Sequence, residues 1–221
     1  MLEAWEFIAR RPELLAEWVL AHLWIIFVAI VAAVILGIIL GVYITGKGRE
    51  QVADTVLYLA EIVMTIPSLA LFGLLMLLLG SIGLKAIGFL PAVIALVVYG
   101  QLPILRNTYT AIQAVDPAMV EAGRGMGMTE SQILFKIKLP LAVPVIMAGL
   151  RNAIVLIIGI ATIAAFIGAS GLGVPIFRGI RNARMDLILV GGVSVSILAL
   201  LVDGFMALVE RRITPKGLRL G

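Results

Sequence analysis

The sequence has no cysteine, a single histidine and few charged residues. Its 221 residues are 14% charged, whereas soluble domains contain about a quarter charged residues. The absence of cysteine excludes disulfides, thiol catalysis and Cys-based metal sites, and His22 alone cannot form a His-rich metal cluster. Lysine and arginine never form a long run despite the net charge of +4, so no nucleic-acid surface is expected.

Hydrophobic residues, in contrast, make up 62% of the chain and are concentrated in long runs. A bilayer core about 30 Å thick needs about 20 apolar residues per helix, and these runs are continuous rather than alternating like the strands of a membrane barrel. We therefore predict an all-α polytopic membrane protein that forms one domain, residues 1–221. Five spans are expected, over residues 23–44, 55–79, 89–108, 139–168 and 187–209.

The distribution of basic residues predicts the orientation in the membrane. Five spans place the termini on opposite sides, and a cytoplasmic C-terminus puts nine Lys/Arg inside and six outside. Because cytoplasmic loops carry the excess of positive charge, we expect the N-terminus outside and the loop 116–138 inside. The first residues include Glu3 and Glu6 and lack the basic start of a signal peptide, so the first span is expected to be retained.

The loop between the third and fourth spans, residues 116–138, contains start signals for two short helices. Asp116 followed by Pro117 is typical of a helix N-cap, and Thr129 with Gln132 is typical of a capping box. Three glycines, expected to end or bend the first helix, lie between these signals: Gly123, Gly125 and Gly127. The pattern predicts a rigid protrusion, and the alternative is an amphipathic hairpin lying on the lipid headgroups.

The same loop resembles a motif of the permease subunits of ATP-binding-cassette (ABC) importers, E-A-A-x3-G-x9-I-x-L-P. The motif positions are occupied by Glu121, Ala122, Gly123, Gly127, Ile137, Leu139 and Pro140. Six of these residues match the motif, and Gly123 stands where the motif has alanine. We also expect Leu139-Pro140 to mark the entry into the next span. Three further stretches are similar to the permeases of osmoprotectant importers: residues 102–112, 168–177 and 213–218.

The resemblance implies the fold of a type I importer permease in a prokaryotic plasma membrane. It also implies two separate ATPase subunits that carry ATP and magnesium, a second permease, identical or related, and an extracytoplasmic substrate-binding protein. The chain would then form the path for glycine betaine, choline, carnitine or a similar solute, without being an enzyme. In the loop, Glu121 and Gly127 would hold the shape, and the ATPase would contact Met119, Ala122 and Met126.

One stretch, residues 41–48, matches the phosphate-binding spacing G-x4-G-K but lacks its magnesium ligand. The position after Lys47 should be serine or threonine and is Gly48, and the stretch follows an apolar helix rather than a strand. We interpret it as the end of a helix with positive charge on the inner side. No ATP site is therefore expected on this chain.

Four charged residues lie inside the predicted spans, where an isolated charge costs several kcal/mol. They are Glu61, Arg106, Arg151 and Asp203, and their charges sum to zero. They either pair with one another inside the bundle or line the translocation path. The ring faces of Tyr58, Tyr99 and Tyr109 could contact a quaternary ammonium. We expect an aromatic cage for the solute on a separate binding protein rather than on this chain.

The last outer loop combines glycines with arginines and admits two interpretations. Its residues Gly171 and Gly173 permit non-helical backbone near the membrane, and Arg178, Arg181 and Arg184 add positive charge. The loop is either an external gate that docks an acidic face of a binding protein, or a solvated hairpin whose arginines contact lipid phosphate.

Three other functions are weighed against the osmoprotectant permease. An ion-coupled secondary transporter is suggested by the acids inside the spans, but the chain shows no internal repeat. An ABC importer permease for a different small solute, such as an amino-acid betaine, keeps the fold and changes the cargo. A membrane enzyme lacks a nucleophile, an acid–base pair and a metal set.

Overall fold

The computed structural model describes residue 9 and residues 11–214, and all regular secondary structure in that part of the chain is helical. This confirms the predicted all-α class. The helices are α2 (Pro12–Ile44), α3 (Glu50–Thr65), α4 (Ser68–Ser81), α5 (Phe89–Gln113), α6 (Pro117–Gly125), α7 (Glu130–Ile133), the π-helix η1 (Leu134–Lys138), α8 (Leu139–Ile163), the 3-10 helix η2 (Ala164–Ile167), α9 (Gly173–Arg181) and α10 (Met185–Ile213).

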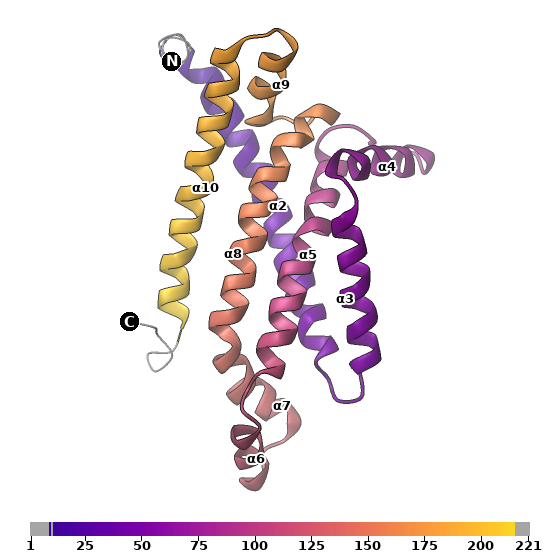
Figure 1. Ribbon diagram of the computed structural model, residues 1–221, viewed down its shortest axis with the longest axis vertical. Coiled ribbons are helices and arrows are strands. Elements are labelled where there is room, and N and C mark those ends of the chain that lie inside the picture. Colours follow the sequence, from indigo (N-terminus) through magenta and orange to yellow (C-terminus); the bar gives the residue numbers. More distant parts are fainter. Residues whose placement is uncertain (1–8, 10, 215–221) are drawn as a thin grey trace.

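Four long helices, α2, α5, α8 and α10, run side by side along the long axis of the molecule (Figure 1). Helices α6 and α7 lie at one end, called here the α6 end, and α9 lies at the other, the α9 end. Within residues 11–214, four helices are long and apolar enough to cross a membrane, or five if the bent pair α3–α4 counts as one span. The number of predicted spans therefore agrees with the structure.

A stripe of small residues on α2 forms the central packing contact. Ala29, Ala33, Gly37 and Gly41 recur every four residues on one face, and all four are buried. A Cβ on Gly37 would lie 2.6 Å from Ile104 Cγ2, so the glycine allows α2 and α5 to approach closely. Small residues at this spacing are the usual means by which membrane helices pack, because lipid supplies no hydrophobic force between them.

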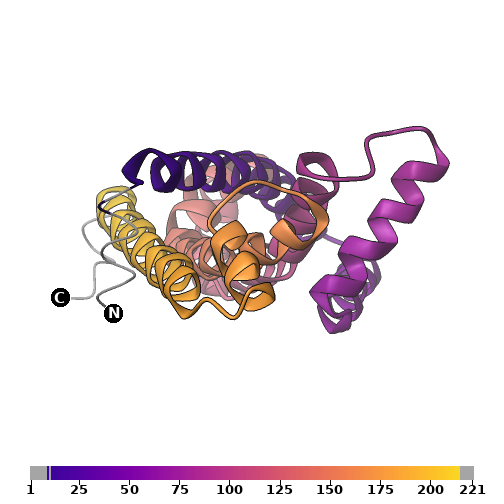
Figure 2. The same ribbon diagram turned by 90° about the horizontal axis from the view of Figure 1, so that it is seen from above.

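The second predicted span, residues 55–79, is not one straight helix. It divides into α3 and α4, which are bent by 103°, and α4 extends sideways from the bundle (Figures 1 and 2). Ile66 is extended, with φ −71° and ψ 125°, as expected of a residue before proline, and Pro67 cannot continue the hydrogen-bond ladder. The carbonyl of Ile66 accepts a hydrogen bond from the Tyr99 hydroxyl, which anchors the bend to α5.

The start of α2 also differs from the predicted start of its span. Helix α2 begins at Pro12 rather than at residue 23, because Pro12 and Glu13 form a favourable first turn. Helix α8 begins at Leu139, where the fourth span is predicted to start, and α7, η1 and α8 form one continuous helical stretch. The amide of Leu139 donates to Leu134 O, five residues back, and this wider turn accommodates the missing N–H of Pro140.

Candidate functional site

The first helix of the loop at the α6 end is capped as its sequence predicts. Asp116 Oδ1 accepts a hydrogen bond of 2.8 Å from the Ala118 amide, and Pro117 occupies the first helical position. The helix ends after Gly125, and Gly127 turns the chain with φ +77°. Only Gly127 acts as the bend, because Gly123 and Gly125 lie within α6.

Gly123 packs closely against the segment that follows the turn. It is buried, and a Cβ at this position would lie 2.8 Å from Ile137 Cδ1 and 3.4 Å from Met128 Sδ. Glycine therefore lets α6 lie directly on η1, whereas alanine would require the Ile137 side chain to shift. This contact gives the departure from the alanine of the motif a physical reason.

The second helix begins with the predicted capping box. Gln132 N donates to Thr129 Oγ1 at 3.3 Å, and Thr129 N donates to Gln132 Oε1 at 2.9 Å. Since α7 continues through η1 into α8, the loop is fixed rigidly to a membrane-crossing helix.

An ion pair that the sequence analysis missed closes the loop. Arg124 Nε and Nη2 lie 3.1 and 3.0 Å from Glu130 Oε1, which ties the end of α6 to the start of α7. The spacing of six residues across the Gly127 turn is the signal that could have indicated it.

The outer surface of α6 combines apolar and acidic side chains. The exposed fractions of Met119 and Met126 are 48% and 74%, and Glu121 and Ala122 are exposed beside them. Within residues 11–214, Glu121 makes no hydrogen bond or ion pair. The expectation that Glu121 holds the shape of the loop is therefore not met, and its carboxylate is available to a partner. We call Met119, Glu121, Ala122 and Met126 the α6 face.

The charged residues inside the spans form two separate groups. Arg106 of α5 pairs with Glu61 of α3. Arg151 of α8 donates two bonds of 2.9 Å to Asp203 and one of 3.0 Å to Glu210. Glu210 was not among the predicted residues, although it lies seven residues after Asp203 and therefore on the same face of α10.

The α9 end is packed through glycines. A Cβ on Gly173 would lie 1.8 Å from Thr162 O, and one on Gly171 would lie 2.8 Å from His22 Nδ1. Figure 2 shows α9 lying over the end of the bundle. The segment is therefore a packed cap rather than a solvated hairpin.

The three arginines of this segment have different surroundings. Arg184 pairs with Asp186, and the Arg178 guanidinium lies 6.0 Å from the centre of the Trp18 ring. Arg178 and Arg181 are exposed.

The described residues form neither a metal site nor a cage of the three tyrosines. Residues 9 and 11–214 contain no group of three or more His, Asp or Glu arranged to hold a metal ion. The exposed fraction of Tyr58 is 64%, whereas that of Tyr99 is 4% and its hydroxyl is bonded to Ile66 O. The basic residues Arg10, Lys216 and Arg219, and most of the stretch 213–218, lie outside the described residues.

Comparison with known proteins gives a match over most of the chain. Residues 33–215 match the family model of the binding-protein-dependent transport system inner membrane component. The osmoprotectant import permease protein OsmW of Salmonella typhimurium is 42% identical, over 93% of this chain and 94% of that protein. The glycine betaine/carnitine/choline transport system permease protein OpuCB of Bacillus subtilis is also 42% identical, over 90% and 88% of the two chains.

Solved structures share the fold. An inward-facing MetNI methionine ABC transporter superposes with a TM-score of 0.80 and 24% identity, over 93% of this chain and 99% of that one. An amino acid ABC transporter superposes with a TM-score of 0.77 and 21% identity, over 93% and 96%. The architecture is thus that of a type I ABC importer permease.

Proposed function

The chain belongs to the family of binding-protein-dependent transport system inner membrane components, and from this premise we propose that it is the permease subunit of an ATP-driven importer of osmoprotectants. The cargo class is that of quaternary ammonium solutes such as glycine betaine, choline and carnitine. This cargo class is supported by the names of two relatives that are 42% identical over at least 90% of this chain.

The observation that carries the energy-coupling part of the proposal is the α6 face. It is exposed on a loop that is bonded within itself by a cap, a capping box and an ion pair. Methionine side chains adapt to a partner's surface, and the carboxylate of Glu121 adds a polar contact. Each of two permease subunits would place this face in a groove of a separate ATPase subunit. Because α7 continues into α8, movement of the ATPases would reach the membrane helices directly.

The proposed assembly has one ATPase pair, a second permease of the same or a related sequence, and a substrate-binding protein. The α6 end then lies in the cytoplasm with the C-terminus, and the N-terminus lies outside. The α9 end faces the binding protein, and the exposed Arg178 and Arg181 dock on acidic residues there. Gly171 and Gly173 would close that end of the path.

We assign the ion pairs inside the membrane to holding the bundle together. Arg151 binds two carboxylates of α10, and Arg106 binds one of α3, so both guanidinium groups have partners within the bundle. Replacing Arg151 with alanine should therefore reduce assembly of the transporter. Full assembly with loss of transport would instead place Arg151 on the path.

The cargo is tested by uptake into vesicles that contain the complete transporter and its binding protein. Radiolabelled glycine betaine, choline, carnitine and methionine are supplied in turn, with ATP or a non-hydrolysable analogue inside. We expect ATP-dependent uptake of at least one quaternary ammonium solute and none of methionine. ATP-dependent uptake of methionine alone would contradict the proposed cargo class, and uptake driven by an ion gradient without ATP would contradict the mechanism.

A further inference from the structure

A cavity of about 680 Å³ lies at the α6 end, beside the loop and separate from the α6 face. It opens between the turn that joins α2 to α3 and the α7–η1 segment. Its lining includes Tyr43 near the end of α2, Glu50 at the start of α3, Gln113 at the end of α5 and Lys138 at the end of η1. Because several membrane-crossing helices start or end here, the cavity lies at the level expected for lipid headgroups.

The lining of this cavity has an excess of positive charge. Four bases line it, Lys47, Arg49, Arg124 and Lys138, against the two acids Glu50 and Glu130. Both acids are already bonded. Glu130 is paired with Arg124, and Glu50 Oε1 accepts from the Gly48 amide at 3.4 Å.

Two of the bases have no counter-charge. Within residues 11–214, neither Lys47 nor Lys138 makes a hydrogen bond or an ion pair, and Lys138 is half-buried. A half-buried ammonium group without a partner is costly, because burial removes water that no acceptor replaces. The cavity therefore has the charge and the free donors that an anion requires.

Arg49 is held in position at the cavity. Its Nη1 donates to Tyr43 O at 2.8 Å, and its guanidinium lies 3.8 Å from the centre of the Tyr43 ring. The exposed fraction of Tyr43 is 52%, which is typical of the aromatic residues that lie at the membrane interface. The remaining N–H groups of Arg49 can bind phosphate oxygens, for which a planar guanidinium is well suited.

We propose that this cavity binds the phosphate of an anionic phospholipid headgroup. Lys47 and Lys138 supply the charge, and Arg49 supplies directed N–H donors. Basic pockets between membrane helices recognise headgroups in this way. A bound headgroup would link the α2–α3 turn to η1, and membrane composition would then influence the position of the loop 116–138. The proposal does not depend on the identity of the transported solute.

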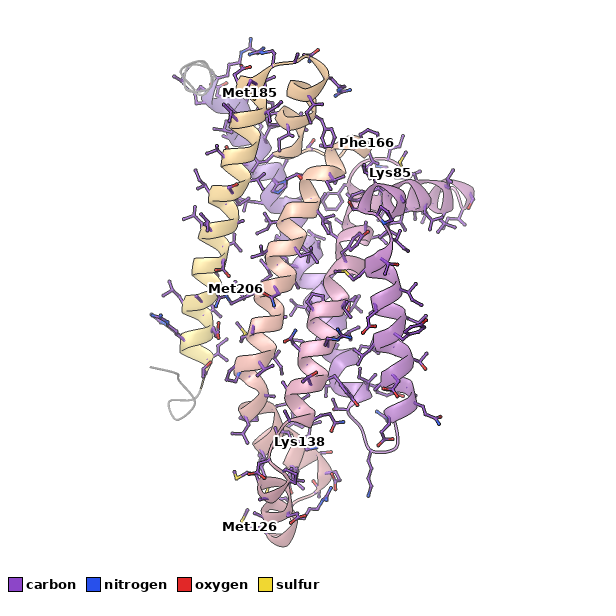
Figure 3. The ribbon with its side chains drawn as sticks, viewed as in Figure 1. Lys85, Met126, Lys138, Phe166, Met185 and Met206 are labelled. Atoms are coloured by element: carbon purple, nitrogen blue, oxygen red, sulfur yellow. The ribbon has the colours of Figure 1, made fainter. Side chains whose placement is uncertain are left out.

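The test compares a Lys47→Gln, Lys138→Gln double variant with a matched Lys85→Gln, Arg181→Gln control. Both variants lose two positive charges. Lys85 and Lys138 lie toward opposite ends of the molecule (Figure 3), so the control leaves the cavity unchanged. The full-length chain, purified in detergent with the subunits that accompany it, is heated with phosphatidylglycerol, phosphatidylcholine or inorganic phosphate. We expect phosphatidylglycerol to raise the Tm of the wild type and of the control by about 5 °C at saturation, and not that of the double variant.

Two other results would overturn the proposal. One is an equal shift with phosphatidylglycerol and phosphatidylcholine, which would remove the selectivity for an anionic headgroup. The other is a full shift with millimolar inorganic phosphate and none with phosphatidylglycerol, which would assign the cavity to a soluble phosphate. If the double variant does not fold, the thermal measurement is replaced by native mass spectrometry of the wild type and of the two single variants. Each single variant should then retain less phosphatidylglycerol than the wild type, and equal retention would overturn the proposal.

Discussion

The two ends of the molecule are built in opposite ways. At the α6 end, the loop 116–138 is held by its own side chains, through the Asp116 cap, the Thr129 capping box and the Arg124–Glu130 pair. At the α9 end, the segment after α8 is held by close contact with other elements, with the Gly173 backbone on Thr162 O. The first element is a self-supporting unit, and the second is a lid that depends on its surroundings.

This difference has a functional meaning. An element that keeps its shape by internal bonds can be moved as a body by a partner without losing structure. An element that is packed through glycines moves only when its neighbours move, because close-packed interfaces have discrete arrangements rather than continuous ones. The α6 end is therefore suited to receive force, and the α9 end is suited to respond to it.

The largest effect is expected at the α9 end, from Gly173→Ala. A Cβ there would lie 1.8 Å from a backbone oxygen, so backbone must shift, and we expect a loss of about 3 kcal/mol or failure to fold. Thermal unfolding of the full-length chain in detergent measures it. The control is Gly192→Ala in α10, where a Cβ would meet no atom within 4 Å. An unchanged Tm for Gly173→Ala would contradict the packed-lid account.

A smaller effect is expected from Gly127→Ala at the α6 end. The φ of +77° costs a residue with a Cβ about 1–2 kcal/mol, and the strain falls on the turn between α6 and α7. ATP-driven uptake should decrease more than Tm does. Gly125→Ala, inside α6 and with open space around it, is the control and should leave uptake at the wild-type level. An equal decrease for both variants would show that the bend is not what uptake requires.

Removal of the cap by Asp116→Ala should destabilise α6 by about 1 kcal/mol. Because the cap acts within the loop, hydrogen exchange in α6 should become about fivefold faster while the global Tm stays the same. Ser131→Ala removes an exposed hydroxyl from the same loop and should change neither quantity. Faster exchange throughout the bundle would show that the loop is not a self-supporting unit.

The smallest effect is expected from the Arg124–Glu130 pair. Both side chains are more than half exposed, at 51% and 69%, so their coupling should be only about 0.5 kcal/mol and should decrease with salt. A double-mutant cycle with Arg124→Ala and Glu130→Ala, measured at low salt and at high salt, determines the coupling. A coupling that does not respond to salt would contradict a solvent-exposed pair.

The sequence predicted best what depends on neighbouring residues. Asp116 and Thr129 cap helices through atoms two or three residues away, so their patterns suffice to predict both starts. The apolar runs likewise predict the long helices. The rigid loop follows from the same local signals.

What the sequence did not predict depends on contacts between distant residues. The bend at Pro67 needs the Tyr99 hydroxyl as a partner for Ile66 O, and no local pattern links residues 66 and 99. The same holds for Gly173 against Thr162 and for Glu210 as a second acceptor for Arg151. Membrane charges indicate that partners exist, but only the packing of the helices selects them.

The central claim, that the α6 face is where an ATPase subunit binds, is tested most directly by two matched methionine substitutions. Met126 at the α6 end and Met185 at the α9 end are 74% and 66% exposed, and Figure 3 shows them at opposite ends. The measurement is the amount of ATPase that co-purifies with Met126→Asp and with Met185→Asp. We expect at least a tenfold loss for Met126→Asp, which corresponds to about 1.4 kcal/mol, and no loss for Met185→Asp. Wild-type recovery of the ATPase with Met126→Asp would contradict the account.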